Sequence, residues 1–419
     1  MSRATSWMPH GPPSCRSRDV RIASISPYMP FRGIPHAGGE YYRRHVELAA
    51  RGHDVVVICP RTADNETAMV HEKNPPYGRV LVTPVSRVHR AAGAREHSLL
   101  SRAVPFLAVR SFWRGLLGDD DALAALRSAD RIELQWFDAI VLAARLRKLV
   151  PATPLIAVFH DVVSQGQARA LAAHKAPLRS RLLAFLRLLL AVPLEKRALN
   201  VLDRAVVLSE KDKLLLQRRR GRAEIVVVAP PLDDVDMPQS PRPAPVPAPE
   251  VLFVGALWRM ENEDAARWLL DEIWPLVRSA VPGARLTIAG GGPSPELERS
   301  AGRYDDVELT GYVKSLSPHY ARASVVVAPM RLGAGVKLKS VTAMLWGVPV
   351  VATAVGAEGV AGPDVFVAVE DDGVAFAKAI IQVLTAPDSV SDVLARAHEW
   401  SHATYSAQSY LRALRGIYA

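Results

Sequence analysis

The chain has 419 residues, of which 49% are hydrophobic, and it carries a formal net charge of +10 at pH 7. This length exceeds one ordinary domain and predicts two domains of roughly 200 residues each. The two cysteines, Cys15 and Cys59, exclude a disulfide-built scaffold and favour a reducing compartment. The positive charge favours anionic partners without choosing among them.

The chain begins with a polar stretch, residues 1–18, that lacks the apolar core of a secretory signal. We expect this stretch to be a disordered leader. No apolar run reaches the ~18 residues that a membrane span needs. These observations favour a cytoplasmic protein.

The first half of the chain alternates strand-like and helix-like segments. A strand at 20–26, a loop containing Gly38 and Gly39, a helix at 40–52 and a strand at 53–60 form one β-α-β unit. The near-continuous apolar strands predict a parallel sheet covered on both faces. Further strands are expected at 79–85, 130–136, 154–160, 203–209 and 224–230.

A proline-rich stretch, residues 231–249, interrupts this alternation and predicts a semi-rigid linker. A second α/β pattern follows it, with a strand at 251–255 and a helix at 261–280. Later strands are expected at 284–292, 306–313, 324–329, 348–353 and 365–369, and later helices at 372–386 and 405–418.

These patterns predict an α/β chain of two doubly wound, Rossmann-like domains facing across a cleft. The expected N-terminal domain spans 19–230 and the C-terminal domain spans 250–395. The last segment, 396–419, is expected to cross back to the N-terminal domain. Ligands of such sheets bind at the carboxyl ends of the strands, so the cleft is the expected site.

A basic glycine loop precedes a predicted helix in the C-terminal half. Gly333 and Gly335 permit close backbone approach, and the helix that follows offers unpaired N–H groups at its start. Arg331 adds a fork of donors and Lys337 a compact charge. The pattern fits a diphosphate, whereas the simpler alternative is a solvated basic loop.

Several motifs together resemble the family 4 glycosyltransferases, which have the GT-B fold. In the C-terminal half these motifs are VLFVGALWRMENEDAARWLLDEIWP, IAGGGP, ELTGYV, VVVAPMRLGAGVKLKS and GVPVVATAVGAEG. In the N-terminal half, HAGGE, VFHDVVSQ and EKRALNVLDRAVVLSEKD match more loosely. The resemblance covers the chain from residue 20 to the end.

The resemblance implies transfer of a sugar from a nucleotide-diphosphate donor, linked to UDP or GDP, to an acceptor hydroxyl of a glycan, lipid or small molecule. It implies retention of anomeric configuration, no metal and no further cofactor. The residues that it assigns to catalysis are His160, Arg331 and Lys337. Those that it assigns to substrate binding are Gly38, Gly39, Val313, Gly333, Gly335, Thr342 and Glu358.

The chain departs from the family at Thr342, where a glutamate usually grips the donor ribose. Losing such a charged hydrogen bond costs about 1.5 to 3 kcal/mol, or roughly ten- to a hundredfold in donor affinity. Family positives after the strand at 251–255 are also missing, because Ala256 and Asn262 stand there, and Arg259 is a candidate replacement. A GT-B binding or partner subunit with weakened catalysis, and a nucleotide-sugar epimerase, are therefore alternative functions.

Residues 178–197 combine a dense apolar run with several basic residues. Such a segment can lie on the inner face of an anionic membrane as a peripheral contact. The alternative is an ordinary helix packed on the sheet with its arginines outward. The basic patches lack interleaved aromatic residues, so we expect no nucleic-acid partner.

Several acidic and polar residues have less specific interpretations. Glu133, Gln135 and Trp136 end a predicted strand and could shape the acceptor side, and Glu195 and Arg197 either line the cleft or lie on a solvated helix face. The aspartate groups at 119–121, 233–234 and 305–306 are read as solvated turns, so no metal site is expected.

Overall fold

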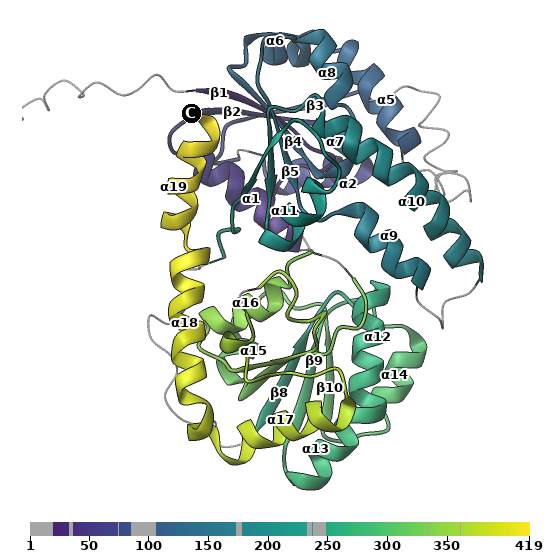
Figure 1. The fold of residues 1–419 in the computed structure, drawn as a ribbon, viewed down its shortest axis with the longest axis vertical. Coiled ribbons are helices and arrows are strands. Elements are labelled where there is room, and N and C mark those ends of the chain that lie inside the picture. The colour runs from purple at the N-terminus through teal and green to yellow at the C-terminus, as the bar shows by residue number, and fades with distance from the viewer. Residues whose placement is uncertain are drawn as a thin grey trace, which may run out of the picture.

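The computed structural model describes residues 20–32, 37–73, 75–84, 106–172, 178–232, 237, 249–333, 335–360 and 362–419. The predicted leader, 1–18, and most of the predicted linker, 231–249, lie outside these residues. Two α/β lobes are stacked along the long axis of the molecule (Figure 1).

The N-terminal lobe is built on a seven-stranded sheet with the order β3-β2-β1-β4-β5-β6-β7. All of its strand pairs are parallel, and Ile25 of β1 aligns with Ile58 of β2 and Leu134 of β4. The sheet order reverses between β1 and β4, which makes their carboxyl ends the expected ligand edge. The strands are β1 (Arg21–Ile25), β2 (Asp54–Pro60), β3 (Arg79–Thr83), β4 (Arg131–Gln135), β5 (Leu155–Phe159), β6 (Arg204–Val207) and β7 (Glu224–Val227).

Helices cover both faces of this sheet, as its apolar strands require. All five residues of β5 are buried. One face packs against α5, α6, α7, α8, the end of α10 and α11, and the other packs mainly against α1. The helices are α1 (Ala37–Ala49), α2 (Ala63–His71), α5 (Phe106–Leu117), α6 (Asp120–Ser128), α7 (Trp136–Ile140), α8 (Ala143–Leu149), α9 (Val163–Ala172), α10 (Leu178–Leu199) and α11 (Glu210–Gln217).

The C-terminal lobe repeats the plan with a six-stranded sheet of order β10-β9-β8-β11-β12-β13. Its strands are also parallel, and its order reverses between β8 and β11. The strands are β8 (Glu250–Val254), β9 (Arg285–Ala289), β10 (Val307–Gly311), β11 (Val325–Ala328), β12 (Val350–Ala352) and β13 (Ala368–Val369). The prediction of two doubly wound domains is therefore confirmed.

The helix predicted at 261–280 contains an irregular turn. It divides into α12 (Met260–Trp268), a π-helical turn η1 (Leu269–Ile273) and α13 (Trp274–Ala280). Pro275 lies at the start of α13 and has no backbone N–H to donate, which favours a wider turn before it. The other elements of this lobe before the last two helices are α14 (Pro295–Ala301), α15 (Ser317–Arg322), α16 (Leu338–Leu345), η2 (Pro363–Val365), α17 (Gly373–Thr385) and η3 (Pro387–Val390).

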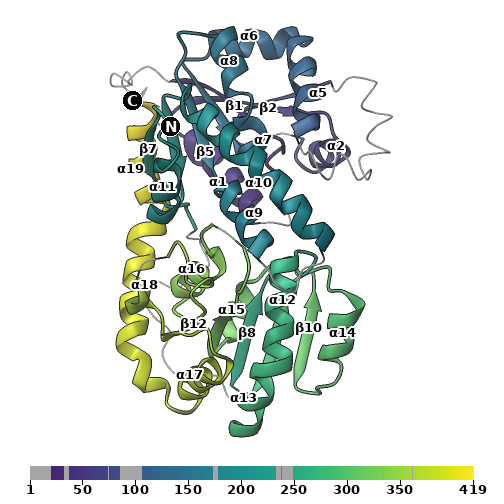
Figure 2. The ribbon, with the colours of Figure 1, turned by 45° about the vertical axis from the view of Figure 1, so that its right-hand side comes forward.

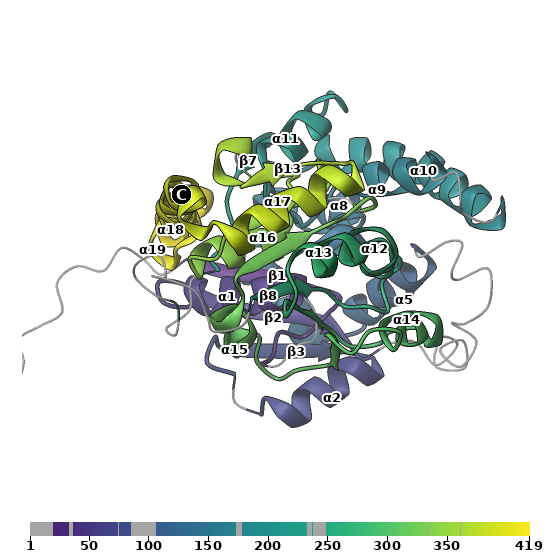
Figure 3. The ribbon, with the colours of Figure 1, turned by 90° about the horizontal axis from the view of Figure 1, so that it is seen from below.

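The last two helices run along one side of both lobes (Figures 1 and 2). Ala397 and Tyr405 of α18 (Ser391–Tyr405) pack into the core of the C-terminal lobe. After Ser406 the chain enters α19 (Ala407–Tyr418), whose buried residues, Tyr410 and Tyr418 among them, join the core of the N-terminal lobe. Seen from below, α18 and α19 lie at the opposite edge of the molecule from α10 (Figure 3). The end of the chain is thus structurally part of the N-terminal lobe.

Candidate functional site

The basic glycine loop lies between β11 and α16, at the carboxyl edge of the C-terminal sheet. Gly333 has φ 107° and Gly335 has φ 74°, a region that side-chain-bearing residues rarely adopt. A Cβ atom added at Gly335 would lie 3.4 Å from the carbonyl oxygen of His160 and 3.5 Å from Cβ of Asp161. The loop therefore meets the end of β5, and the structure brings the predicted residues Gly333, Gly335 and His160 to one boundary.

Two lysines at the start of α16 concentrate positive charge behind this loop. Lys337 is buried, and its Nζ donates to the carbonyl oxygen of Gly335 at 3.0 Å. Burial, followed by the charges of Glu358, Lys211 and Arg169, leaves the pKa of Lys337 lowered to about 8. Burial and the neighbouring Lys337 lower the pKa of Lys339 to about 7. Both ammonium groups are therefore held in an unfavourable environment that an anion would relieve.

Lys339 was missed in the sequence, although it stands two residues after Lys337. Its Nζ lies 2.8 Å from Oδ1 of Asn262, 3.6 Å from Sδ of Met330 and 4.5 Å from the ring centre of Phe253. Among the described residues, no carboxylate forms an ion pair with it. Lys339 thus brings a cation to Asn262, one of the two positions where the resemblance implies a positive residue. The linear sequence does not show this contact.

Arg331 is already paired with a carboxylate of its own lobe, so its guanidinium is not reserved for a bound anion. Its guanidinium makes a two-pronged pair with Asp264 of α12, at 2.7 and 3.0 Å, and lies 5.2 Å from the ring centre of Trp268. An incoming diphosphate would compete with Asp264 for these donors. The catalytic role predicted for Arg331 stays a prediction.

Glu358 joins the two lobes. Its carboxylate pairs with Arg169 of α9 at 2.5 Å and with Lys211 of α11 at 3.1 Å, and Gln165 donates to it at 3.3 Å. Arg169 also donates to the carbonyl oxygen of Gly333. Burial acts to raise the pKa of Glu358, but the hydrogen bonds and charges of Arg169 and Lys211 together lower it. Glu358 therefore fixes the glycine loop against α9, and its substrate-binding role stays a prediction.

His160 lies in an aromatic setting at the end of β5. Its ring stacks on Trp136 at 4.1 Å between centres, and the edge of Tyr41 lies 5.1 Å away. Trp136 has φ 62°, a strained conformation for a tryptophan, directly after β4. In this conformation the indole ring stacks on His160 at the carboxyl edge of the sheet, where ligands of this fold bind.

The predicted loop position of Gly38 and Gly39 is wrong. Helix α1 begins at Ala37, so both glycines occupy its first turn, where N–H groups lack intrahelical acceptors. Two adjacent glycines are typical of a turn, but small residues can also start a helix. Tyr41, in the same helix, contacts His160, which brings this turn to the lobe boundary.

A buried hydrogen-bond network extends from His160 into the N-terminal core. Nε2 of His160 lies 2.9 Å from Oε1 of Gln135, whose Nε2 donates to Glu133. Glu133 also accepts from His45 at 2.7 Å and from the hydroxyl of Tyr418 at 3.0 Å. Glu133 and Gln135 are buried, so they can shape the acceptor side only through His160, and that role stays a prediction.

The network continues through His45 into the last helix. Nδ1 of His45 lies 2.7 Å from the hydroxyl of Tyr410, which lies 3.0 Å from that of Tyr41. Burial raises the pKa of both tyrosines, so both hydroxyls keep their protons. Tyr410 can therefore donate to Nδ1, which leaves Nε2–H of His45 to donate to Glu133.

Other predicted residues lie further along the C-terminal sheet edge. Thr342 lies one turn into α16, where it hydrogen-bonds Tyr320 and limits the rise of that phenol's pKa, which is caused chiefly by burial. Val313 follows β10, next to Tyr312, whose side chain is 60% exposed. Trp258, 64% exposed, covers Gly292. These exposed aromatic rings were not predicted, and the glycine run at 290–292 beneath them was their only signal.

The remaining acidic candidates are structural. Asp119 caps α6, and Asp306 accepts from the indole of Trp274 at 3.0 Å. Glu195 is buried, where it pairs with Arg219 at 2.8 Å and accepts from Ser164 at 2.8 Å, so neither of its predicted settings is correct. In the described part of the chain, no three His, Cys, Asp or Glu side chains form a group that could hold a metal ion.

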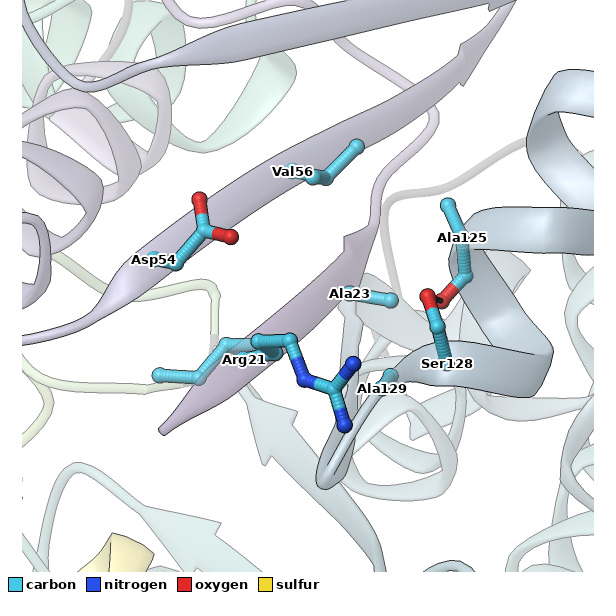
Figure 4. A pocket seen from close by; sticks show the side chains of 8 residues that line it. Arg21, Ala23, Asp54, Val56, Ala125, Ser128 and Ala129 are labelled. Carbon is cyan, nitrogen blue, oxygen red and sulfur yellow. Dashed lines mark hydrogen bonds between the residues drawn. The ribbon is translucent and has the colours of Figure 1, made fainter. Parts of the chain in front are cut away.

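A recess in the N-terminal lobe lies away from this boundary. Arg21, Asp54, Val56, Ala125 and Ser128 are among the residues that line it (Figure 4). Arg21 and Asp54 begin β1 and β2, so the recess is at the amino edge of the sheet. Arg21 is already paired with Asp130 at 3.1 Å. The recess contributes nothing to the site at the carboxyl edge.

Comparison with known proteins agrees with this architecture. Residues 248–386 match the family model of the glycosyl transferases group 1. An uncharacterized 44.6 kDa protein from the cps region of Klebsiella pneumoniae is 36% identical over 141 residues, which are 31% of this chain. The match spans only 36% of the length of that relative.

Solved structures resemble the whole chain. Sucrose-phosphate synthase from Thermosynechococcus elongatus has a TM-score of 0.68 at 18% identity, covering 96% of this chain and 98% of the other. HepE of Anabaena in complex with UDP-glucose has a TM-score of 0.64 at 15% identity, covering 94% and 98%. The trehalose-6-phosphate synthase OtsA has a TM-score of 0.66 at 14% identity, covering 95% and 98%. The C-terminal domain therefore matches the glycosyl transferases group 1 model, and the whole chain has the two-domain GT-B fold.

Proposed function

We propose that this protein is a family 4 glycosyltransferase that moves a sugar from a nucleotide-diphosphate donor to an acceptor hydroxyl. The observation that carries the proposal is the pair Lys337 and Lys339 behind the glycine loop. Burial lowers the pKa of both lysines, and Lys339 makes no ion pair with a described carboxylate. Two neighbouring ammonium groups beside a helix start suit the two negative charges of a diphosphate.

The donor would lie along the carboxyl edge of the C-terminal sheet. The diphosphate would contact Lys337, Lys339 and the backbone of the glycine loop. The base would lie near Val313, where the exposed rings of Trp258 and Tyr312 offer stacking surfaces. The ribose would lie near Thr342. A neighbour of the same fold, HepE, is described in complex with UDP-glucose, which supports a UDP-linked donor.

The chemistry proposed for this site is dissociative and retaining. The bond between the anomeric carbon and the β-phosphate oxygen breaks, and the lysines stabilise the charge that develops on the leaving diphosphate. The acceptor oxygen bonds to the anomeric carbon from the same face, and its proton passes to the departing phosphate oxygen. His160, set by Trp136 and Gln135, would contact the sugar and its phosphate. This route needs neither a metal nor a pair of carboxylates, unlike glycoside hydrolysis.

The function is tested by measuring donor binding and donor turnover separately. Calorimetry with UDP, GDP and dTDP and their sugar conjugates should show binding to one nucleotide class. Incubation of that donor should release nucleoside diphosphate, faster when acceptor hydroxyls are present. Binding without turnover would favour the partner-subunit alternative, and conversion to an isomeric nucleotide sugar would favour the epimerase. Absence of binding to every nucleotide would overturn the proposal.

Thr342→Glu tests the ribose position. A carboxylate near the ribose hydroxyls should tighten donor binding by roughly ten- to a hundredfold, because a hydrogen bond to a charged group replaces a neutral one. Thr342→Gln, similar in size but uncharged, is the matched control and should gain less. Equal affinities for the wild type and the glutamate variant, both folded, would remove the ribose from this position.

A further inference from the structure

Helix α10 presents a continuous apolar stripe to solvent. Its large exposed residues recur at helical spacing along one face. The exposed fraction is 82% for the first of these residues, Leu178, and 39% for the last, Leu190. They are Leu178, Leu182, Phe185, Leu186, Leu189 and Leu190. Arg179 and Arg197 face outward, as expected for an ordinary packed helix, but leucines face outward along this stretch as well.

The inner side of the helix explains this orientation. Small residues, Ala184 and Ala191, are buried there, while Arg181 turns back to donate to the carbonyl oxygen of Leu171 in α9 at 3.1 Å. The helix thus packs closely on α9 through its small side and leaves its bulky side uncovered. A stripe of this length on a surface helix marks an interaction site.

The charge around the stripe selects its partner. Between residues 163 and 199 the sequence holds one acidic residue, Glu195, and that residue is buried with Arg219. Exposed basic residues stand at both ends of the helix, Arg179 at the start and Lys196 and Arg197 near the end. Apolar side chains flanked by cations, without exposed acids, match a surface with a hydrocarbon interior and anionic headgroups.

We propose that α10 is a docking surface for an anionic lipid bilayer, with the stripe inserted below the headgroups and the basic ends bound to them. None of the helices in the described residues is long and apolar enough to cross a bilayer. In Figures 1 and 3, α10 lies at the outer edge of the N-terminal lobe, where a planar surface can reach it.

The docked surface would lie beside the lobe boundary. Helix α9, on which α10 packs, carries Arg169, which contacts Gly333 and Glu358 of the other lobe. A bilayer on α10 would therefore bring membrane-carried acceptors near the glycine loop. This consequence rests on the transferase function proposed above, whereas the docking surface does not.

Vesicle co-sedimentation of the full chain tests the surface. We expect binding to vesicles of phosphatidylglycerol and phosphatidylcholine, weak binding to phosphatidylcholine alone, and less binding at high salt. Leu186→Glu with Leu189→Glu should lower the partition coefficient at least about tenfold, because charged side chains resist insertion. Leu214→Glu is the matched control, since Leu214 on α11 is 58% exposed but lies outside the stripe, and it should bind like the wild type.

Two outcomes would overturn the docking surface. The first is equal vesicle binding by the wild type and the stripe variant, provided that thermal unfolding shows both to be folded. The second is a wild type that ignores vesicles but sediments as a dimer that the stripe variant breaks, which would make the stripe an interface between copies. The stripe variant should bind nucleotide as tightly as the wild type does. A negative result for the docking surface is therefore distinguishable from a negative result for the transferase function.

Discussion

Lys339→Met is expected to weaken donor binding by roughly ten- to a hundredfold, and Lys337→Met by a similar factor. Each change removes a charged hydrogen-bond donor worth about 1.5 to 3 kcal/mol at a desolvated diphosphate. Methionine keeps most of the side-chain volume, so the packing of Lys339 against Phe253 is largely preserved. Calorimetric titration with the nucleotide sugar that binds the wild type measures the loss.

The same substitutions should leave the fold intact or strengthen it. Burial lowers the pKa of both lysines, which means that the folded protein disfavours their charged forms. Lys378→Met, at an exposed position on α17, is the matched control and should change neither affinity nor stability. Donor affinity unchanged in both lysine variants would remove the diphosphate from this loop.

Donor affinity should also fall as the pH rises. The free protein loses protons from Lys339 and Lys337 near pH 7 and 8, respectively. A bound diphosphate raises both pKa values, so the complex holds more protons than the free protein in this range, and binding takes up protons. Affinity is therefore highest below about pH 7 and declines above it. The phosphates of a nucleotide sugar keep their charges throughout, so the trend belongs to the protein, and it should flatten in the double Lys→Met variant.

Much of the fold was predictable because its strands are nearly uninterrupted apolar runs. The five residues of β5 carry enough local information to identify a strand buried on both faces. The alternation with helices then leaves few possible topologies. The start of α1 escaped prediction because Gly38 and Gly39 signal turns when they are read locally.

The site was harder to predict because its contacts join distant parts of the chain. Lys339 reaches Asn262 across 77 positions, and His45 reaches Tyr410 across 365. No local pattern records such pairs. The sequence indicated that residues 178–197 are either a peripheral membrane contact or a packed helix, but it did not show which side of α10 is exposed, because apolar residues occur all round the helix and only packing on α9 decides which side is covered.

His45→Leu is expected to lower the free energy of unfolding by about 3 to 5 kcal/mol. His45 and Glu133 are both buried, and their side chains meet at 2.7 Å. Leucine at this position removes one donor to the buried carboxylate of Glu133, which then keeps the donors Gln135 and Tyr418, and it also leaves the buried hydroxyl of Tyr410 without its acceptor on His45. Urea denaturation measures the loss. Tyr42→Phe, in the same helix, is the control, because it removes only a 2.9 Å hydrogen bond to Ser24 and should cost about 1 kcal/mol.

The double variant His45→Leu with Glu133→Leu distinguishes two causes of the lost stability, the broken contact with Glu133 and the changed packing around position 45. If the loss in the single variant arises from a stranded carboxylate, removing that carboxylate should restore much of the stability. If the double variant instead loses as much free energy of unfolding as the two single variants added together, the pairing of His45 with Glu133 is contradicted. In the double variant Gln135 keeps its contact with His160 but loses Glu133, which holds its amide in place, so the ring of His160 is oriented less firmly. We therefore expect the double variant to be folded and stable but to turn over the donor roughly a hundredfold more slowly than the wild type, with donor affinity nearly unchanged.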